Sequence, residues 1–206
     1  MQRPPPLSPP VASAPVLLYS YGALMAPSAL TKRSVAPLRS APASLADCNT
    51  CLAFAHRGGY ATLLSSPPAS GAAYRAPPGV LHTLHSPADL QRLAANEVGY
   101  RLTTLQVTPC DGPPVAAAVF LSSPLLVLRA PAPPRRRYRD LLLEGCTHHG
   151  LGQLDPEYVA WLEGLQVAEP GQPLGAAHND CPAQTLAQGL AAGALAAAAW
   201  ASVHHS

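Results

Sequence analysis

Charged residues are scarce in this chain, and aromatic residues are scarcer. Only 12% of the 206 residues are Asp, Glu, Lys or Arg, and 5% are Phe, Trp or Tyr. The formal net charge of +2 is too small to predict a nucleic-acid-binding surface. The only basic run is Arg135-Arg136-Arg137, which follows a proline-rich stretch and is explained by a solvated loop. We therefore expect no nucleic-acid partner.

The chain also lacks the cysteine pattern of a disulfide-stapled protein. Its five cysteines are an odd number, and no secretory signal pattern is present, so we expect a cytoplasmic protein, with organelle targeting left open. Cys48 and Cys51 form a lone Cys-x-x-Cys motif without a second ligand pair, and the paired histidines lack the helical spacing of metal ligands. We expect no metal and no cofactor. A thiol-redox or metal protein that uses these two cysteines is the weakest of three functional hypotheses.

Long hydrophobic runs are missing except for one alanine-rich stretch near the C-terminus. Residues 183–203 are uncharged and long enough to span a bilayer, but alanine contributes little to insertion. We expect a solvated tail there, with a marginal membrane anchor as the alternative. Residues 1–15 are rich in proline and contain no acidic residue, which predicts a disordered leader. One domain is then expected over residues 16–167, followed by a linker and tail over residues 168–206. The sequence gives no oligomeric state.

Short hydrophobic segments separated by turn residues predict a mixture of strands and helices. Apolar or alternating stretches predict strands over residues 16–21, 60–64, 80–84, 100–107 and 115–121, with a mixed strand signal over 43–54. Helices are expected over residues 138–146 and 156–165, and from residue 87 to between 96 and 99, with a short helix or turn between 26 and 39. Ser86 and Asp155 are the expected N-caps. Residues 67–78 and 122–137 are expected to be connections, with a strand edge at 125–128 left open.

The first expected strand ends in a glycine turn at Gly22, and the rest of the chain can be placed relative to it. Glycine lets the backbone approach a ligand closely, and a turn with free backbone N–H groups can hold a carboxylate or an oxyanion. Spacing alone favours the simpler interpretation, an ordinary first strand followed by its turn.

Glu97 is the acidic residue that stands out. It lies at the junction of an expected helix and strand, and no lysine or arginine lies within three residues of it in the sequence. Burial there would raise its pKa and make it a usable base near neutral pH. Without other information, a surface carboxylate at a helix end is the simpler interpretation.

These two features belong to an ordered series of motifs. Tyr21-Gly22-Ala23-Leu24-Met25 is followed by Gly58-Gly59-Tyr60-Ala61-Thr62-Leu63, then Pro78-Gly79-Val80-Leu81-His82-Thr83-Leu84, then the segment from Asp89 to Tyr100 that contains Glu97, and then Tyr138-Arg139-Asp140-Leu141-Leu142-Leu143-Glu144-Gly145-Cys146. Across residues 16–167 this series resembles the gamma-glutamylcyclotransferase-like superfamily.

The resemblance implies an α+β fold, a small mixed β-barrel with surrounding helices. It implies an enzyme that cyclises a gamma-glutamyl amino acid, peptide or amine to 5-oxoproline, with a small gamma-glutamyl substrate as its partner and no cofactor. Glu97 matches the family's catalytic glutamate and would act as general acid and base. The substrate-binding residues that the resemblance implies are Tyr21, Gly22, Ala23, Leu24, Tyr100 and Tyr138. Tyr21 and Tyr138 would donate phenol hydrogen bonds.

The sequence departs from the family pattern at two places. Ala23-Leu24 replaces the Ser-Asn pair of members that act on free gamma-glutamyl amino acids, and Ala94 stands where the family usually has aspartate. The first change puts the identity of the substrate in doubt. A second hypothesis is therefore a catalytically inactive relative that binds a small ligand or a protein.

Overall fold

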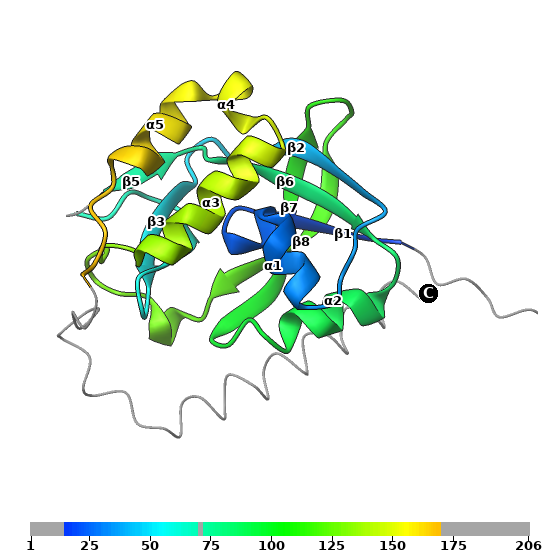
Figure 1. Cartoon of the computed structure of the whole chain (residues 1–206), viewed down its shortest axis with the longest axis horizontal. Helices are drawn as coiled ribbons and strands as arrows, with labels where there is room; N and C mark the ends of the chain where they lie inside the picture. The colour runs from blue at the N-terminus through cyan, green and yellow to red at the C-terminus, as the bar shows by residue number, and fades with distance from the viewer. Residues whose placement is uncertain (1–14, 70–71, 170–206) are drawn as a thin grey trace, which may run out of the picture.

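The computed structural model describes residues 15–69 and 72–169, which form a closed barrel, a second small sheet and several helices (Figure 1). The expected N-terminal leader and alanine-rich tail lie outside the described residues, apart from Pro15 and residues 168–169. The single domain expected over residues 16–167 remains a prediction.

Five strands close into the barrel in the order β1-β6-β2-β7-β8. They are β1 (Val16–Ser20), β2 (Arg39–Leu45), β6 (Pro78–Leu84), β7 (Tyr100–Pro109) and β8 (Val115–Ser122). Neighbouring strands are antiparallel except β1 and β8, which run parallel and pair at Leu18 and Ala118. The expected α+β class with a small mixed barrel is confirmed.

A three-stranded sheet in the order β4-β3-β5 adjoins the barrel. It contains β3 (Cys51–His56), β4 (Tyr60–Leu64) and β5 (Ala73–Arg75). The expectation that residues 67–78 form only a connection is wrong, because β5 pairs with β3 and β6 begins at Pro78. The mixed strand expected over residues 43–54 is two strands, since the segment between Leu45 and Cys51 leaves the barrel for the second sheet.

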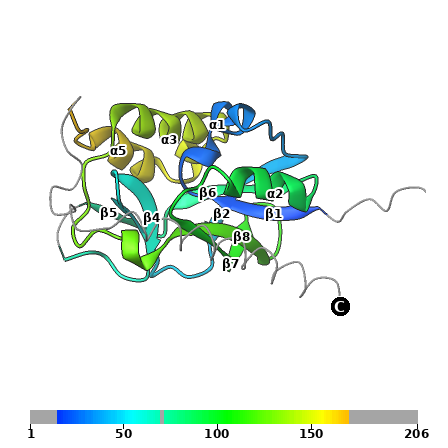
Figure 2. The same cartoon turned by 90° about the horizontal axis from the view of Figure 1, so that it is seen from below.

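The helical elements are η1 (Ala23–Met25), α1 (Pro27–Lys32), α2 (Pro87–Ala94), η2 (Pro124–Leu126), α3 (Arg136–His148), α4 (Leu151–Leu154) and α5 (Pro156–Gly164). Figure 2 shows α1, α3 and α5 along one side of the barrel, and α2 beside β1. The observed α3 is longer at both ends than the helix expected over residues 138–146, and the sequence does not predict α4. The strand edge left open at residues 125–128 is instead the short helix η2, followed by an isolated bridge from Val127 to His56.

The two expected helix caps differ in outcome. Asp155 caps α5 as expected, because its Oδ1 accepts a hydrogen bond from the Tyr158 N–H at 2.9 Å. Ser86 stands at the N-cap position of α2, but its side chain makes no capping hydrogen bond. The expected N-cap position and the opening of the helix by Pro87 are confirmed, without a hydrogen bond from the Ser86 hydroxyl.

Two clusters of buried apolar side chains hold the elements together. The larger one joins the barrel and the second sheet to α3 and α5, and includes Tyr19, Val107, Leu142 and Leu162. The smaller one lies between β1, α1 and α2, and includes Leu24, Leu30, Leu90, Leu93 and Phe120. Leu24 belongs to the segment directly after β1, so packing of the smaller cluster fixes where that segment lies.

Within residues 15–69 and 72–169, no helix is long and apolar enough to cross a membrane. The same residues contain no group of three His, Cys, Asp or Glu side chains that could hold a metal ion. Cys48 is an exposed free thiol and Cys51 a buried one. The location of the protein in the cell remains a prediction.

Candidate active site

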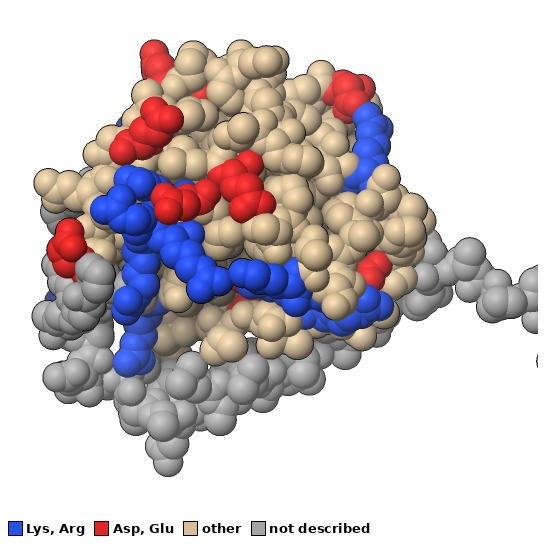
Figure 3. Space-filling view, in the orientation of Figure 1, with Lys and Arg blue, Asp and Glu red and all other residues tan. Residues whose placement is uncertain are grey.

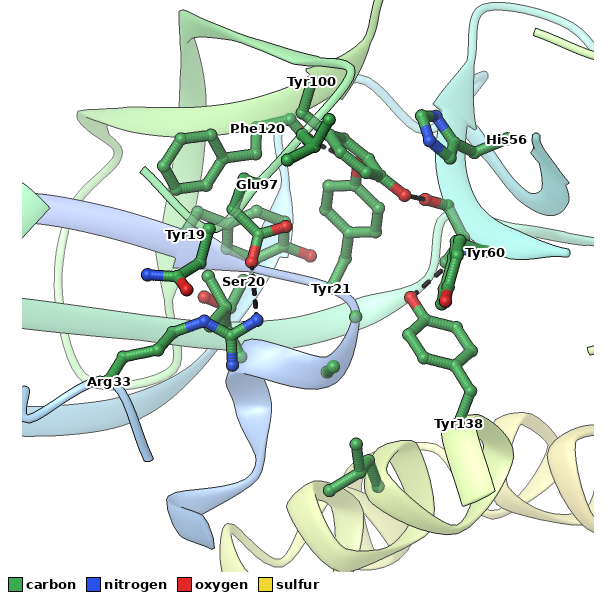
Figure 4. A pocket seen from close by; sticks show the side chains of 17 residues that line it. Tyr19, Ser20, Tyr21, Arg33, His56, Tyr60, Glu97, Tyr100, Phe120 and Tyr138 are labelled. Carbon is green, nitrogen blue, oxygen red and sulfur yellow. Dashed lines mark hydrogen bonds and ion pairs between the residues drawn. The ribbon is translucent and has the colours of Figure 1, made fainter. Parts of the chain in front are cut away.

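A cavity of about 360 Å³ lies where β1 ends (Figure 4). Its walls come from the segment after β1, from the end of α1, from the turn between α2 and β7, and from aromatic side chains of β4, β7 and α3. All seven residues that the sequence singled out line it: Tyr21, Gly22, Ala23, Leu24, Glu97, Tyr100 and Tyr138. Their chemical roles remain predictions, but the structure brings them together.

The backbone after β1 has satisfied carbonyl groups and unsatisfied N–H groups. The carbonyls of Gly22 and Ala23 accept hydrogen bonds at 3.0 Å from the N–H groups of Met25 and Ala26. In the described part of the chain, the N–H groups of Gly22 and Leu24 have no backbone acceptor. An N–H group without a backbone acceptor in the wall of a cavity can donate to a ligand there.

Two histidine side chains form hydrogen bonds to backbone carbonyls of this segment. His82 Nε2 donates to the Leu24 carbonyl and His149 Nε2 to the Met25 carbonyl, each at 3.1 Å. Because a carbonyl only accepts, we assign the ring proton to Nε2, and His82 Nδ1 then accepts from the Ser40 hydroxyl at 2.8 Å. Burial lowers the pKa of His82 to about 4, with a smaller contribution from His149, so its ring is neutral at pH 7.

Glu97 is a mostly buried carboxylate. Its side chain is 17% exposed, which excludes the simpler interpretation of a solvated surface acid. Burial raises its pKa above the ordinary value, and the Arg33 guanidinium opposes this increase by its charge and by a hydrogen bond. Arg33 Nη2 lies 3.1 Å from Glu97 Oε1, as Figure 4 shows. The acid that lacks a basic neighbour in the sequence therefore has one in space.

The hydroxyl of Tyr138 is positioned by backbone N–H groups. Its oxygen accepts a hydrogen bond from the Ala61 N–H at 3.2 Å. Burial raises the pKa of Tyr138, whereas hydrogen bonds from the N–H groups of Ala61 and Ala23 lower it. A phenol that accepts from N–H groups keeps its own proton for another acceptor. A Cβ atom at Gly22 would lie 2.9 Å from this oxygen, so the close approach needs glycine.

Tyr21 and Tyr100 use their hydroxyl groups differently. The Tyr21 hydroxyl donates to the Phe120 carbonyl, and the Tyr100 hydroxyl donates to the Ala61 carbonyl at 2.8 Å. Each phenol has one proton, so neither has a donor left for a ligand. In this arrangement both rings form walls of the cavity, and the expected phenol hydrogen bond from Tyr21 to a substrate stays a prediction.

Several cavity residues were missed by the sequence reasoning. His56 stacks on Tyr100 with ring centres 4.3 Å apart, and its Nδ1 bonds the Ser122 hydroxyl at 2.8 Å. Burial lowers the pKa of His56 to about 4. Tyr60 packs edge-on against Tyr138 at 5.0 Å. Arg33 was also missed, although its place in the segment after the glycine turn is a signal that could have been used.

Comparison with solved structures identifies the fold. The chain is similar to a gamma-glutamyl cyclotransferase at a TM-score of 0.57 and 21% identity, over 77% of this chain and 92% of that one. It is similar to the uncharacterized human protein loc79017 at a TM-score of 0.59 and 19% identity, over 78% of this chain and 93% of that one. It is also similar to YkqA from Bacillus subtilis at a TM-score of 0.55 and 20% identity, over 75% of this chain and 56% of that one.

No protein-family model and no curated protein sequence matches the chain. The similarity to solved structures therefore establishes the gamma-glutamyl cyclotransferase-like fold, and the chemistry has to be argued from the cavity.

Proposed function

We propose that this chain of gamma-glutamyl cyclotransferase-like fold cyclises a gamma-glutamyl amino acid, peptide or amine to 5-oxoproline and releases the amine. One observation supports this more than any other. A mostly buried carboxylate, Glu97, and backbone N–H groups without backbone acceptors, those of Gly22 and Leu24, line the same cavity. Its volume of about 360 Å³ is in the range of small-molecule sites.

The proposed reaction is an intramolecular aminolysis. The α-amino nitrogen of the substrate forms a bond to its own γ-carbonyl carbon and closes a five-membered ring. The bond from this carbon to the leaving amine then breaks, and no electrons are transferred to or from another group. Holding the substrate in the folded conformer provides much of the acceleration, because nucleophile and carbonyl belong to one molecule.

Glu97 would carry the proton in this reaction. Its ionised carboxylate would take a proton from the α-ammonium group, which makes the nitrogen nucleophilic. The same proton would then pass to the nitrogen of the leaving amine. A carboxyl group whose pKa is raised by burial suits both steps, because its pKa lies closer to neutral pH.

The oxyanion of the tetrahedral intermediate needs hydrogen-bond donors. The N–H groups of Gly22 and Leu24 are candidates because they have no backbone acceptor. The Tyr138 hydroxyl is a third candidate, since its oxygen already accepts from backbone and its proton is free to be donated. Fixed donors in a partly enclosed site stabilise a developing charge more than water does.

The direct test is product analysis. Purified protein would be incubated separately with gamma-glutamyl-alanine, glutathione and a gamma-glutamyl-lysine isopeptide, and both 5-oxoproline and the released amine would be measured. The reaction should produce the two in equal amounts. Glu97→Gln should abolish most turnover of whichever substrate reacts. Glu163→Gln is the matched control, because Glu163 is exposed on α5 and does not line the cavity.

A second candidate function is a binding protein without catalysis. The ion pair with Arg33 supports it, because this pair lowers the basicity of Glu97 and occupies one of its oxygens. Such a protein would bind gamma-glutamyl compounds in a calorimeter and form no 5-oxoproline from any of the three substrates. Formation of 5-oxoproline that depends on Glu97 would reject it.

A further inference from the structure

Arg33 reaches the cavity from the same segment of chain as the glycine turn. It directly follows α1, which in turn follows η1. Its Nη1 donates to the Ala29 carbonyl at 3.0 Å, and its Nη2 donates to Glu97 Oε1 at 3.1 Å. The guanidinium is therefore held between a backbone carbonyl and the carboxylate of the proposed site, and its side chain is 22% exposed.

The backbone beside Arg33 forms the C-terminal cap of α1. Ser34 has a φ of 54°, and it is one of two non-glycine residues with positive φ in the part of the chain that the structure describes. The N–H groups of Ser34 and Val35 donate to the Thr31 and Leu30 carbonyls at 2.9 and 3.1 Å, which is the Schellman pattern of a helix end. The Ser34 carbonyl accepts a hydrogen bond from Arg92 Nη1 at 3.0 Å, which ties this turn to α2. The cap and this hydrogen bond fix the backbone from which the Arg33 side chain extends.

The hydrogen-bonding capacity of this side of the cavity is not used up. A guanidinium has five N–H donors, and two acceptors, Ala29 and Glu97, serve Arg33. Among the described residues, the buried Nε of Arg33 has no partner, and the buried hydroxyl of Ser20, another cavity residue, has none either. The Glu97 carboxylate therefore offsets only part of the free-energy cost of burying the Arg33 guanidinium. A second hydrogen-bond acceptor would offset more of this cost.

The charge around the cavity also favours an anionic group. Figure 3 shows Lys and Arg side chains in a band across the face that carries α1 and α3 in Figure 1, with Asp and Glu side chains next to part of it. Arg33 directly follows α1, and its side chain forms part of the cavity wall. Arg33 is the one Lys or Arg side chain among the described residues that line the cavity, and its charge attracts carboxylates.

We propose that Arg33 binds the α-carboxylate of the substrate and, together with Glu97, forms a paired receptor for the zwitterionic end of a gamma-glutamyl group. This proposal rests on the proposed function, because it names the part of the substrate that the site recognises. The α-carboxylate bonds the free edge of the guanidinium, which matches carboxylate geometry. The α-ammonium lies against the second oxygen of Glu97, where it must lose its proton for ring closure.

The four charges then alternate in sign, so each one faces an opposite neighbour. The ion pair seen without substrate has the same arrangement with the two substrate charges left out. Arg33 is accordingly a specificity-determining residue, and compounds that lack the α-carboxylate should be poor substrates even when they can cyclise.

The test compares two substrates that differ only in this carboxylate. Gamma-glutamyl-alanine gives 5-oxoproline, and 4-aminobutanoyl-alanine gives 2-pyrrolidinone by the same ring closure. The wild-type protein should prefer the first by about 100-fold in kcat/KM, since charge-assisted bonds of this kind have large effects. At a pH above the acid limb of both proteins, Arg33→Met should lower kcat/KM for gamma-glutamyl-alanine by about the same factor and change that for 4-aminobutanoyl-alanine by less than about threefold.

Two further variants serve as controls. Arg33→Lys keeps the charge without the planar fork and should restore part of the preference. Arg39→Met removes an exposed arginine that pairs with Asp111 outside the cavity, and it should leave the preference unchanged. If Arg33→Met lowers turnover of both substrates equally, Arg33 acts only through Glu97 and the proposal is wrong.

A binding measurement separates this proposal from the proposed function. If the wild-type protein turns over neither substrate, the enzymatic function fails, and calorimetry with 5-oxoproline and 2-pyrrolidinone then decides the role of Arg33. Preference for 5-oxoproline that is lost in Arg33→Met supports the carboxylate site without catalysis. Equal affinity for the two rings, in the wild type and in the variant, would overturn it.

Discussion

The cavity has two walls that differ in how far their polar groups are already satisfied. The aromatic wall consists of Tyr21, Tyr100 and Tyr138, and the charged wall consists of Arg33 and Glu97. In the aromatic wall, two of three phenols donate their only proton to backbone carbonyls. In the charged wall, the ion pair leaves Glu97 Oε2 and part of the Arg33 guanidinium without a hydrogen-bond partner among the described residues.

This difference indicates that the two committed phenols of the aromatic wall shape the cavity, whereas the charged wall can take part in the reaction. A phenol whose proton is committed to a buried carbonyl contributes a fixed surface, because breaking that bond would leave the carbonyl unpaired. A carboxylate with one free oxygen can accept a proton at little structural cost. Tyr138 is the exception in the aromatic wall, since it accepts from the backbone and can still donate. The following experiments test this division.

The largest effect is expected at the charged wall. Glu97→Gln keeps the size of the side chain but removes the base, so kcat for the best gamma-glutamyl substrate should fall by about 10²–10⁴-fold. The melting temperature, measured by circular dichroism, should fall, because the neutral amide leaves the mostly buried Arg33 guanidinium without its counter-charge. Unchanged turnover would move the proton transfer to another group.

A somewhat smaller effect is expected for the phenol that can still donate. Tyr138→Phe should lower kcat by about 100-fold through the loss of one oxyanion donor, with a smaller change in KM. Steady-state kinetics with the substrate found in product analysis would measure both. A change in KM alone would place Tyr138 with the purely structural tyrosines.

The pH dependence of activity distinguishes the contributions of burial and of Arg33. Only the ionised Glu97 can take up the ammonium proton, so kcat/KM should fall as the pH drops through its pKa. Burial raises this pKa above 4.5, and Arg33 lowers it, so Arg33→Met should move the acid limb to higher pH. A limb that stays in place would show that the ion pair does not set the basicity of Glu97 during turnover.

The smallest effect on catalysis is expected for a committed phenol. Tyr100→Phe should change kcat/KM by less than about threefold, because its hydroxyl has no proton left for a substrate. It should lower the free energy of unfolding by about 1 kcal/mol, since the Ala61 carbonyl loses its partner. Urea denaturation measures the second effect. A larger loss of activity than of stability would contradict the division between the two walls.

Features with local causes could be predicted from the sequence. Asp155 followed by Pro156 signals a helix start within two residues, and the structure has both the cap and the helix. The strand β5 could not be found in this way, because its three residues lie in a proline- and glycine-rich segment and gain their conformation by pairing with β3. Pairing of this kind depends on the tertiary fold.

The candidate site shows the same limit. Glu97 and the glycine turn each have a recognisable neighbourhood in the sequence, but the pairing of Glu97 with Arg33 joins residues that are 64 positions apart. The hydrogen bond from the Tyr100 hydroxyl to Ala61 likewise crosses 39 positions. The first depends on the docking of α1 and α2 beside the barrel, and the second on the packing of β4 of the second sheet against the barrel, so no local pattern predicts either.

The candidate donors of the glycine turn are backbone N–H groups, and this affects which substitutions the protein can accept during evolution. Leu24 packs in the smaller apolar cluster, and its carbonyl is tied to His82, so this position is constrained by the interior. Ala23 is only half-buried and offers its backbone rather than its side chain. Side chains can therefore be exchanged at Ala23 while the N–H donors stay in place, which makes this single position a natural point for altering substrate preference by selection or by directed evolution.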